Sequence, residues 1–211
     1  MKIKALLYCT KANPTLYNVL GKFITTKYMG KDFKQDGLTH PELNGKIVAE
    51  CDFEVEEIEY DWYPCNIVPK WDHYYTYYRT NKIEPKEFYE KSCLNWEQLN
   101  SYLNDYDSQS FKDGYAIHIK NLKERVMELS NVYKYDNSYD NMFGWIFEDK
   151  EKYNPLIKAP QNMMRVWLFE NGEWIMYILI SIRPEWLYKI LNGEKTIEVR
   201  KKVLKEMLKK D

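Results

Sequence analysis

The stretch from residue 177 to residue 200 constrains the fold most, because its pattern changes from strand to helix and back. The apolar run Tyr177–Ile182 predicts a buried strand. A helix then begins at Pro184 and ends before Gly193, since proline suits the first helical turn and glycine the position just past the end. Residues 194–200 alternate as a second strand. This succession places a helix between two strands, in a chain that we expect to be of the α+β class.

Other segments carry equally simple patterns. Residues 45–58 alternate between apolar and largely acidic side chains, and the runs 3–8 and 114–121 are further predicted strands. Residues 159–167 should pair with residues 175–182 through a hairpin that turns at Glu170-Asn171-Gly172. We expect a helix over Trp96–Leu103 with Asn95 as its N-cap, a loop or short hairpin over 21–45, and an irregular packed segment over 60–79.

Length and composition favour one globular domain spanning residues 1–211. The chain has 45% apolar and 30% charged residues, and its longest apolar run, Trp174–Ile182, is too short to cross a bilayer. Four cysteines form no CxxC pair and have no histidine at ligand spacing, which predicts reduced thiols rather than a zinc site or a disulfide scaffold. We expect no bound metal and no cofactor. We therefore expect a cytoplasmic protein that does not associate with membranes; its oligomeric state stays open.

The charges are distributed unevenly. Residues 189–211 carry eight Lys or Arg against four acids, and residues 1–11 carry three Lys and no acid, whereas the whole chain has 31 basic and 32 acidic residues. The acidic middle disfavours long duplex DNA, which needs many cations to neutralise its phosphates. A local phosphate contact near the ends stays possible. The 16% aromatic content can serve stacking on bases or a core.

Residues 180–201 resemble the signature of the ASCH domain, a PUA-like β-barrel family whose motif is approximately G-x-K-x-x-E-x-R. The matching residues are Gly193, Lys195, Glu198 and Arg200. Strand-like segments that normally follow this signature precede it in this chain. The resemblance therefore implies a circularly permuted PUA-like mixed or antiparallel β-barrel with flanking helices. The signature would occupy residues 178–205, a Tyr/Trp-rich insertion would lie near 60–111, and a further insertion would lie near 125–158. Completion of a neighbouring chain's barrel by swapping is an alternative.

The family likeness also implies a function, the binding of RNA or a modified nucleotide in a cationic cleft beside the signature helix. Lys195, Glu198 and Arg200 would line this cleft, because Arg offers a planar fork, Lys a point charge and Glu a hydrogen-bond acceptor. A carboxylate between two cations favours binding over general-acid chemistry. Without the likeness, the same three residues would read as a solvated strand face.

Five more residues are candidates for ligand binding, each with an ordinary structural alternative. Arg183 can reach a phosphate but is also typical of an exposed helix start. Gln161 can read a base edge but also suits a turn. Tyr8, Thr10 and Trp186 can contact a ligand but are also typical of core or rim positions. Glu50, Asp52 and Glu54 can hold a cation or form a polar sheet face.

Two other functions compete with binding. The first is an enzyme, a ribonuclease or base hydrolase, with Glu198 as general base and Lys195 as a further catalytic candidate. The second is an accessory protein of a bacteriophage or mobile element that sequesters a nucleotide or binds a protein partner through the aromatic insertion 60–111. The sequence leaves open whether there is turnover.

Overall fold

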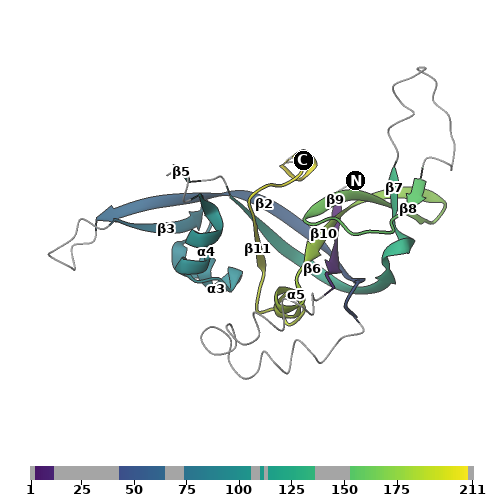
Figure 1. Cartoon of the computed structure of the whole chain (residues 1–211), viewed down its shortest axis with the longest axis horizontal. Helices are drawn as coiled ribbons and strands as arrows, with labels where there is room; N and C mark the ends of the chain where they lie inside the picture. Colours follow the sequence, from purple (N-terminus) through teal and green to yellow (C-terminus); the bar gives the residue numbers. More distant parts are fainter. Residues whose placement is uncertain are drawn as a thin grey trace, which may run out of the picture. The chain divides into compact units, whose positions relative to one another are not determined.

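The protein is described by a computed structural model covering residues 3–11, 43–64, 74–105, 110–111, 114–135 and 153–208, with the backbone alone at 61–64, 74–77, 104–105 and 110–111. Its described helices are α3 (Pro85–Ser92), α4 (Trp96–Leu103) and α5 (Pro184–Leu191) (Figure 1). Two single 3-10 turns lie at Leu129–Asn131 and Lys205–Leu208. The remaining elements are strands, so the chain is a sheet-dominated α+β protein, which confirms the predicted class.

Nine described strands pair in one sheet in the order β11-β6-β2-β1-β10-β9-β7-β8, with β3 paired to β2. β1 and β10 are parallel, whereas the pairs β1–β2, β9–β10, β2–β3, β6–β11, β7–β8 and β7–β9 are antiparallel. The order is open, so the strands described here do not make the closed barrel that was expected. The strands of the sheet are β1 (Lys4–Cys9), β2 (Lys46–Pro64), β3 (Tyr74–Thr80), β6 (Tyr115–Glu128), β7 (Tyr133–Tyr135), β8 (Tyr153–Pro155), β9 (Met163–Glu170), β10 (Glu173–Ile182) and β11 (Ile197–Arg200); β4 (Asn104–Asp105) and β5 (Ser110–Phe111) form a separate pair.

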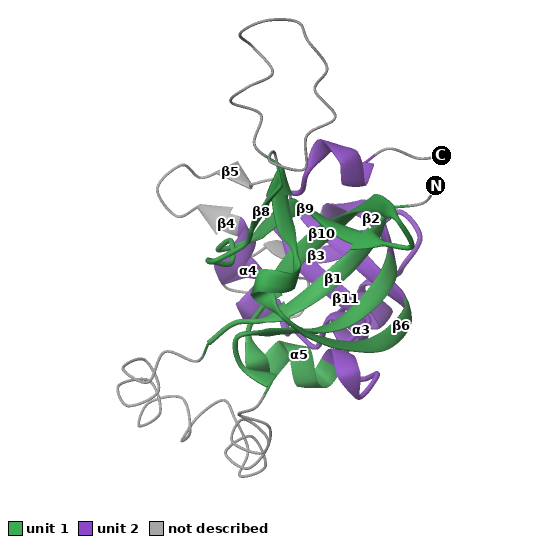
Figure 2. Ribbon diagram, turned by 90° about the vertical axis from the view of Figure 1, so that its right-hand side faces the viewer, with its two compact units in different colours: residues 1–52, 121–189 green, residues 53–120, 190–211 purple. Residues whose placement is uncertain are grey.

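The chain divides into two compact units, coloured separately in Figure 2. Unit 1 comprises residues 1–52 and 121–189, and unit 2 comprises residues 53–120 and 190–211. The long strands β2 and β6 each contribute residues to both units, because the boundaries fall within them.

Unit 1 is built on the parallel pair β1–β10, with β9 antiparallel to β10. Alternate residues of these strands point into one apolar core, in which Leu6, Val166 and Leu179 are fully buried. The hairpin between β9 and β10 turns at Asn171-Gly172, whose φ angles of 50° and 86° suit a tight two-residue turn. This hairpin confirms the pairing predicted from the sequence.

Unit 2 packs α3 and α4 around the ends of β2, β3 and β11. Its core contains Phe88, Leu99 and Ile197, all completely buried. Asn95 Oδ1 accepts a hydrogen bond from the Gln98 N–H at 2.8 Å, and Gln98 Oε1 accepts one from the Asn95 N–H at 2.9 Å. This reciprocal arrangement is a capping box, and it confirms Asn95 as the N-cap of α4.

Two expectations about connecting segments are wrong in part, and a third falls mostly on residues that the structure does not describe. The described parts of the segment 60–79 are not irregular, because β2 continues to Pro64 and pairs with β3 from Ile58↔Thr80 to Pro64↔Tyr74. Likewise, part of the expected insertion 125–158 is regular, since it contains the end of β6 and the strands β7 and β8. Most of the predicted loop 21–45, and residues 65–73 and 136–152, lie outside the described residues.

Candidate functional site

The signature residues of unit 2 lie on and just before β11, which pairs with β6 from Ile197↔His118 to Arg200↔Tyr115. Ile197 and Val199 face the unit 2 core, as their alternation predicts. Glu198 Oε1 lies 2.9 Å from the guanidinium of Arg200, and its Oε2 lies 3.4 Å from Lys195 Nζ. The structure therefore brings Lys195, Glu198 and Arg200 together as a chain of two ion pairs.

Lys195 occupies an unusual environment for a lysine, with only 2% of its surface exposed. Its Nζ donates a hydrogen bond of 2.6 Å to the carbonyl oxygen of Ser92, at the C-terminal end of α3. Burial lowers the pKa of Lys195, against the opposing effect of Glu198. The adjacent Thr196 N–H donates to the carbonyl oxygen of Lys91 at 2.9 Å. Lys195 and Thr196 therefore each satisfy one carbonyl group at the end of α3.

The other five predicted site residues belong to unit 1. Tyr8 is paired with Ser181, and the Thr10 N–H donates to the carbonyl oxygen of Ile182 at 2.9 Å. Because β1 and β10 are parallel, their carboxyl ends lie at the same edge of the sheet. Tyr8 is only 6% exposed and belongs to the core, and burial raises its pKa. Thr10 is half-buried at the strand end.

Gln161 and Arg183 reach the same edge from neighbouring segments. The Ser181 N–H donates to the carbonyl oxygen of Asn162 at 2.8 Å, which fixes the segment containing Gln161 beside the end of β10. Arg183 follows β10 directly, and its carbonyl oxygen accepts the Trp186 N–H at 3.1 Å in the first turn of α5. Gln161 and Arg183 are exposed, whereas Trp186 is half-buried with Lys189 Nζ 5.6 Å from its ring centroid.

Lys11 is a further cation at this edge that the sequence interpretation passed over. It follows Thr10 and is exposed, and its side chain lies against Gly45, whose N–H donates to the carbonyl oxygen of Cys9 at 2.8 Å. The cluster of lysines near the N-terminus was the available signal. The carboxyl ends of β1 and β10 thus carry two exposed cations together with a hydroxyl and a side-chain amide.

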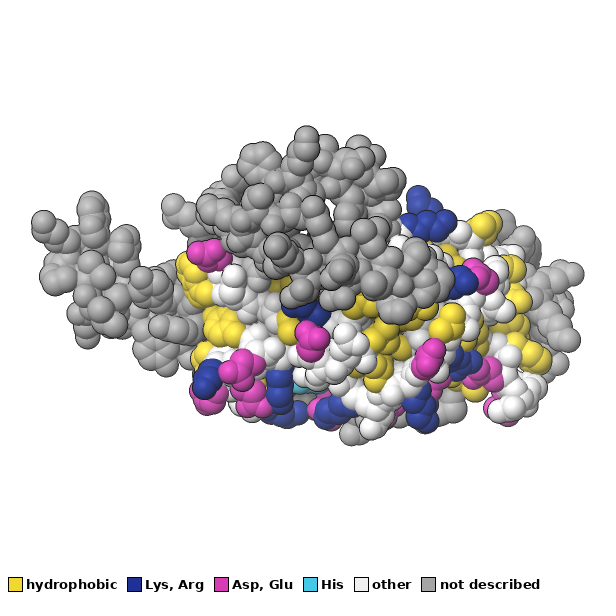
Figure 3. Space-filling model, turned by 90° about the horizontal axis from the view of Figure 1, so that it is seen from below, with side chains coloured by type: hydrophobic (Ala, Val, Ile, Leu, Met, Phe, Trp, Pro, Cys, Tyr) yellow, Lys and Arg dark blue, Asp and Glu magenta, His cyan; other side chains and the backbone are white. Residues whose placement is uncertain are grey.

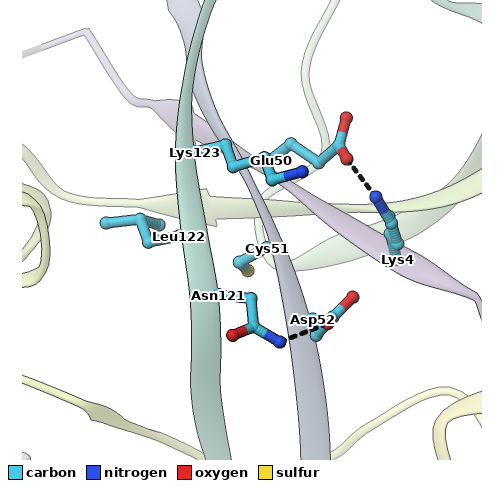
Figure 4. A pocket seen from close by; sticks show the side chains of 7 residues that line it. All are labelled: Lys4, Glu50, Cys51, Asp52, Asn121, Leu122 and Lys123. Carbon is cyan, nitrogen blue, oxygen red and sulfur yellow. Dashed lines mark hydrogen bonds and ion pairs between the residues drawn. The ribbon is translucent and has the colours of Figure 1, made fainter.

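A separate shallow pocket of about 320 Å³ lies on unit 1 (Figure 4). Its lining consists of Lys4 from β1, Glu50, Cys51 and Asp52 from β2, and Asn121, Leu122 and Lys123 from β6. Lys4 points toward Glu50, and the Asn121 amide donates to Asp52 at 2.7 Å. These polar groups hold one another rather than pointing jointly into the pocket.

Glu50 is the most enclosed acid of this region, at 9% exposed. Lys4 Nζ lies 2.5 Å from its Oε1 and Arg125 Nη1 lies 2.5 Å from its Oε2. Arg125 also pairs with Glu170, which accepts a hydrogen bond from the Tyr177 hydroxyl at 3.0 Å. Burial acts to raise the pKa of Glu50, but the hydrogen bonds from Lys4 and Arg125 outweigh it and lower that pKa.

Each acid of the acidic face predicted over β2 therefore has a partner within the protein. Glu50 and Glu54 pair with cations, and Asp52 accepts a hydrogen bond from an amide. Beyond Glu50 and Asp52, Glu54 lies 2.7 Å from Lys120 Nζ, and this hydrogen bond lowers the Glu54 pKa. Figure 3 shows the same intermixing, with basic and acidic side chains side by side across the described part of the face that it presents. This pairing supports the polar sheet face over the cation site.

His118 is the one described histidine, and its Nε2 lies 2.8 Å from Glu56 Oε2. Burial acts to raise the pKa of Glu56, but hydrogen bonds from Thr80 and His118 outweigh it and lower that pKa. This contact gives His118 a structural role in unit 2. His40 and His73 lie outside the described residues.

Cys9 and Cys51 are buried free thiols, and burial raises the pKa of each to about 12. Cys93 is also free, whereas Cys65 lies outside the described residues. Within the described ranges, no three His, Cys, Asp or Glu side chains gather closely enough to hold a metal ion. None of the described helices has the length and apolar character needed to span a bilayer.

Comparison with known proteins finds no family model, curated protein or solved structure that matches this chain.

Proposed function

We propose that this protein binds a nucleotide or a short single-stranded RNA beside α5, at the carboxyl ends of β1 and β10. The observation that carries the proposal is the parallel pairing of these strands, which places Thr10, Gln161 and Arg183 at one edge of unit 1. Ligands of sheets with parallel strands commonly bind at such strand ends. Lys11 adds a second exposed cation at this edge.

The residue types at this edge suit a nucleotide. A guanidinium such as that of Arg183 can donate two parallel hydrogen bonds to a phosphate. The side-chain amide of Gln161 can both donate to and accept from a base edge. The Thr10 hydroxyl can pair with a phosphate or a ribose. Two cations suffice for one or two phosphates, which agrees with a short ligand rather than a long duplex.

The resemblance to the ASCH family adds a second part to the proposal. We propose that the chain is a circularly permuted PUA-like domain, in which Lys195, Glu198 and Arg200 form a binding surface of their own on unit 2. In this assignment Lys195 acts through Glu198, because its amino group is buried against Ser92. Glu198 in turn holds the guanidinium of Arg200 at 2.9 Å, and Arg200 would contact the ligand.

Binding is favoured over turnover by the contacts of Glu198. One of its oxygens faces Arg200 at 2.9 Å and the other faces Lys195 at 3.4 Å. A general base must accept a proton from the substrate or from a water molecule through an oxygen within hydrogen-bond reach. Both oxygens of Glu198 are already engaged, so we propose a binding module.

The direct test is fluorescence anisotropy with a labelled single-stranded tetraribonucleotide. We expect Arg183→Ala to weaken binding roughly tenfold and to reduce the salt dependence by about one phosphate contact. Gln161→Ala should weaken binding less and change the base preference. Lys134→Ala, which removes an exposed cation from β7, is the matched control. Equal affinity of the Arg183 variant and the parent chain would refute the proposed site.

A further inference from the structure

Unit 1 carries six aromatic side chains on one face of the strands β7 to β10. The register pairs Trp174 with Phe169, Tyr133 with Trp167 and Tyr135 with Tyr153, and directly paired residues share a face. We call this set the aromatic face; its members are Tyr133, Tyr135, Tyr153, Trp167, Phe169 and Trp174.

The rings of the aromatic face contact one another continuously. Tyr153 stacks on Trp174 with ring centroids 3.8 Å apart and planes 7° apart, and Tyr133 meets Trp174 edge-on at 5.1 Å. Phe169 lies 5.2 Å from Trp174 at the margin of the set and is 52% exposed. The other five rings are half-buried. The set thus offers a preformed apolar surface with one accessible ring at its margin.

The carboxylates of these strands lie on the side opposite the aromatic face. The alternation along β9 places Arg165 on the side of Trp167 and Phe169, and Arg165 is exposed. Both acids of β7 to β10, Glu170 and Glu173, lie on the opposite side, where Arg125 pairs with Glu170. Among the described residues of these four strands, the aromatic face has a cation and no carboxylate. A surface of this kind complements an anionic chain that carries flat rings.

β9 runs from the segment of Gln161, at the edge that also holds Thr10 and Arg183, to the aromatic face. β9 begins at Met163, two residues after Gln161, and Arg165, Trp167 and Phe169 follow on one side of the strand. At about 3.4 Å per residue, Phe169 lies about 20 Å along the strand from Met163. A ligand that covers both places must therefore extend over several nucleotides.

We propose that the ligand is a single-stranded nucleic acid of several nucleotides that runs along β9 and stacks a base on Phe169. This inference rests on the proposed function, because one end of the strand would occupy the site at Arg183. Arg165 would contact a phosphate between the two places. The ligand is single-stranded because only bases that are not stacked in a duplex can lie flat against an aromatic ring.

The experiment compares uridine monophosphate with single-stranded oligouridylates of two, four and eight residues by isothermal titration with the full chain. We expect affinity to rise with length at least tenfold between the dimer and the octamer. Phe169→Ala should weaken octamer binding about fivefold or more and leave dimer binding unchanged. Arg165→Ala should lower the salt dependence for the octamer alone.

Two controls distinguish this inference from the proposed function. Tyr60→Ala removes an aromatic side chain that is 43% exposed in unit 2 and should leave octamer binding unchanged. An eight-base-pair RNA duplex should bind at least tenfold more weakly than the single strand. If dimer binding depends on Arg183 but the octamer gains nothing from Phe169, the inference is wrong and the proposed function stands. Loss of the Arg183 dependence, with the Phe169 dependence kept, would overturn the proposed function instead.

Discussion

The amino group of Lys195 lies 2.6 Å from the carbonyl oxygen of Ser92, at the end of α3. Lysine is rarely buried so completely, because removing its charge from water is costly unless hydrogen bonds and an opposite charge compensate. Here the Ser92 carbonyl and Glu198 provide both. The signature lysine therefore stabilises unit 2 by joining α3 to the segment before β11.

Replacing Lys195 by alanine should lower the free energy of unfolding by about 3 kcal/mol, because it leaves a cavity and removes one partner of a buried ion pair. Lys195→Met retains most of the side-chain volume, so its free energy of unfolding should fall by less. Urea denaturation measures both values. Lys202→Ala, an exposed lysine nearby, is the control and should change stability by no more than about 0.5 kcal/mol. A Lys195→Ala chain as stable as the parent would contradict this role.

Glu50→Gln should destabilise the protein by about 2 kcal/mol near neutral pH, because Lys4 and Arg125 then lose a charged acceptor. The pKa of Glu50 is lowered in the folded chain, so its ionised form contributes stability that is fully present above its ordinary pKa of 4.5. This contribution is lost as pH falls through the lowered pKa. Denaturation between pH 7 and pH 3 should therefore show the parent and variant converging on acidification.

Glu124→Gln is the matched control for this pH dependence, because Glu124 is exposed on β6 one residue before Arg125. The free energy of unfolding of the Glu124→Gln chain should differ from that of the parent by a small and constant amount between pH 7 and pH 3. A gap between Glu50→Gln and the parent that is constant down to pH 3 would show that the Glu50 charge does not stabilise the folded state.

Asn95→Ala should lower the free energy of unfolding by about 1 kcal/mol, because the first turn of α4 then loses its side-chain acceptor. Asn95→Asp retains the acceptor and should be close to the parent. Thermal denaturation followed by circular dichroism compares the three chains. An alanine variant that melts with the aspartate variant would show that the capping box contributes nothing.

The buried cysteines Cys9 and Cys51 should react with iodoacetamide only after the chain is unfolded. Iodoacetamide reacts with thiolates, and burial raises the pKa of Cys9 and Cys51 to about 12. Peptide mass spectrometry of the native chain treated at pH 8 should find both unmodified. Both should become modified after denaturation in guanidinium. Modification of Cys51 in the native chain at the denatured rate would contradict its burial between the strands of unit 1.

Local patterns predicted those elements whose determinants lie close together in the sequence. The turn at Asn171-Gly172 was predicted because these residues adopt positive φ angles readily, and the cap at Asn95 because its partner is three residues away. Helix α3 escaped notice because only Phe88 and Ser92 of its eight residues are buried, which leaves a weak apolar period.

The contacts of the site residues depend on distant partners, so the sequence did not reveal them. Alternation along β11 gave the correct side for Ile197 and Val199, but it could not show that Lys195 bonds to a carbonyl 103 residues away. Similarly, the acidic face of β2 was recognised while its partner Arg125, 75 residues from Glu50, was not. Only the tertiary structure brings these opposite charges together.

The order of the elements leads to a last prediction. The ASCH resemblance implies that the signature precedes the barrel strands in the family order, so a chain beginning with β10 should also fold. We expect this of a permutant that starts at Gly172, ends at Asn171 and joins residue 211 to residue 1 through a Gly/Ser linker. Both ends of this chain lie in an exposed turn, where interruption is tolerated.

The free energy of unfolding of this permutant should lie within about 2 kcal/mol of the parent value, because a flexible linker adds little closure entropy. Tetraribonucleotide affinity should also be retained. A second permutant with the same linker but opened between Tyr177 and Ile178 interrupts a buried strand and should not fold cooperatively. If neither chain folds, the termini do not lie close enough to be joined, and the permuted PUA-like assignment is wrong. If the first alone folds, the order of its elements matches that implied by the resemblance.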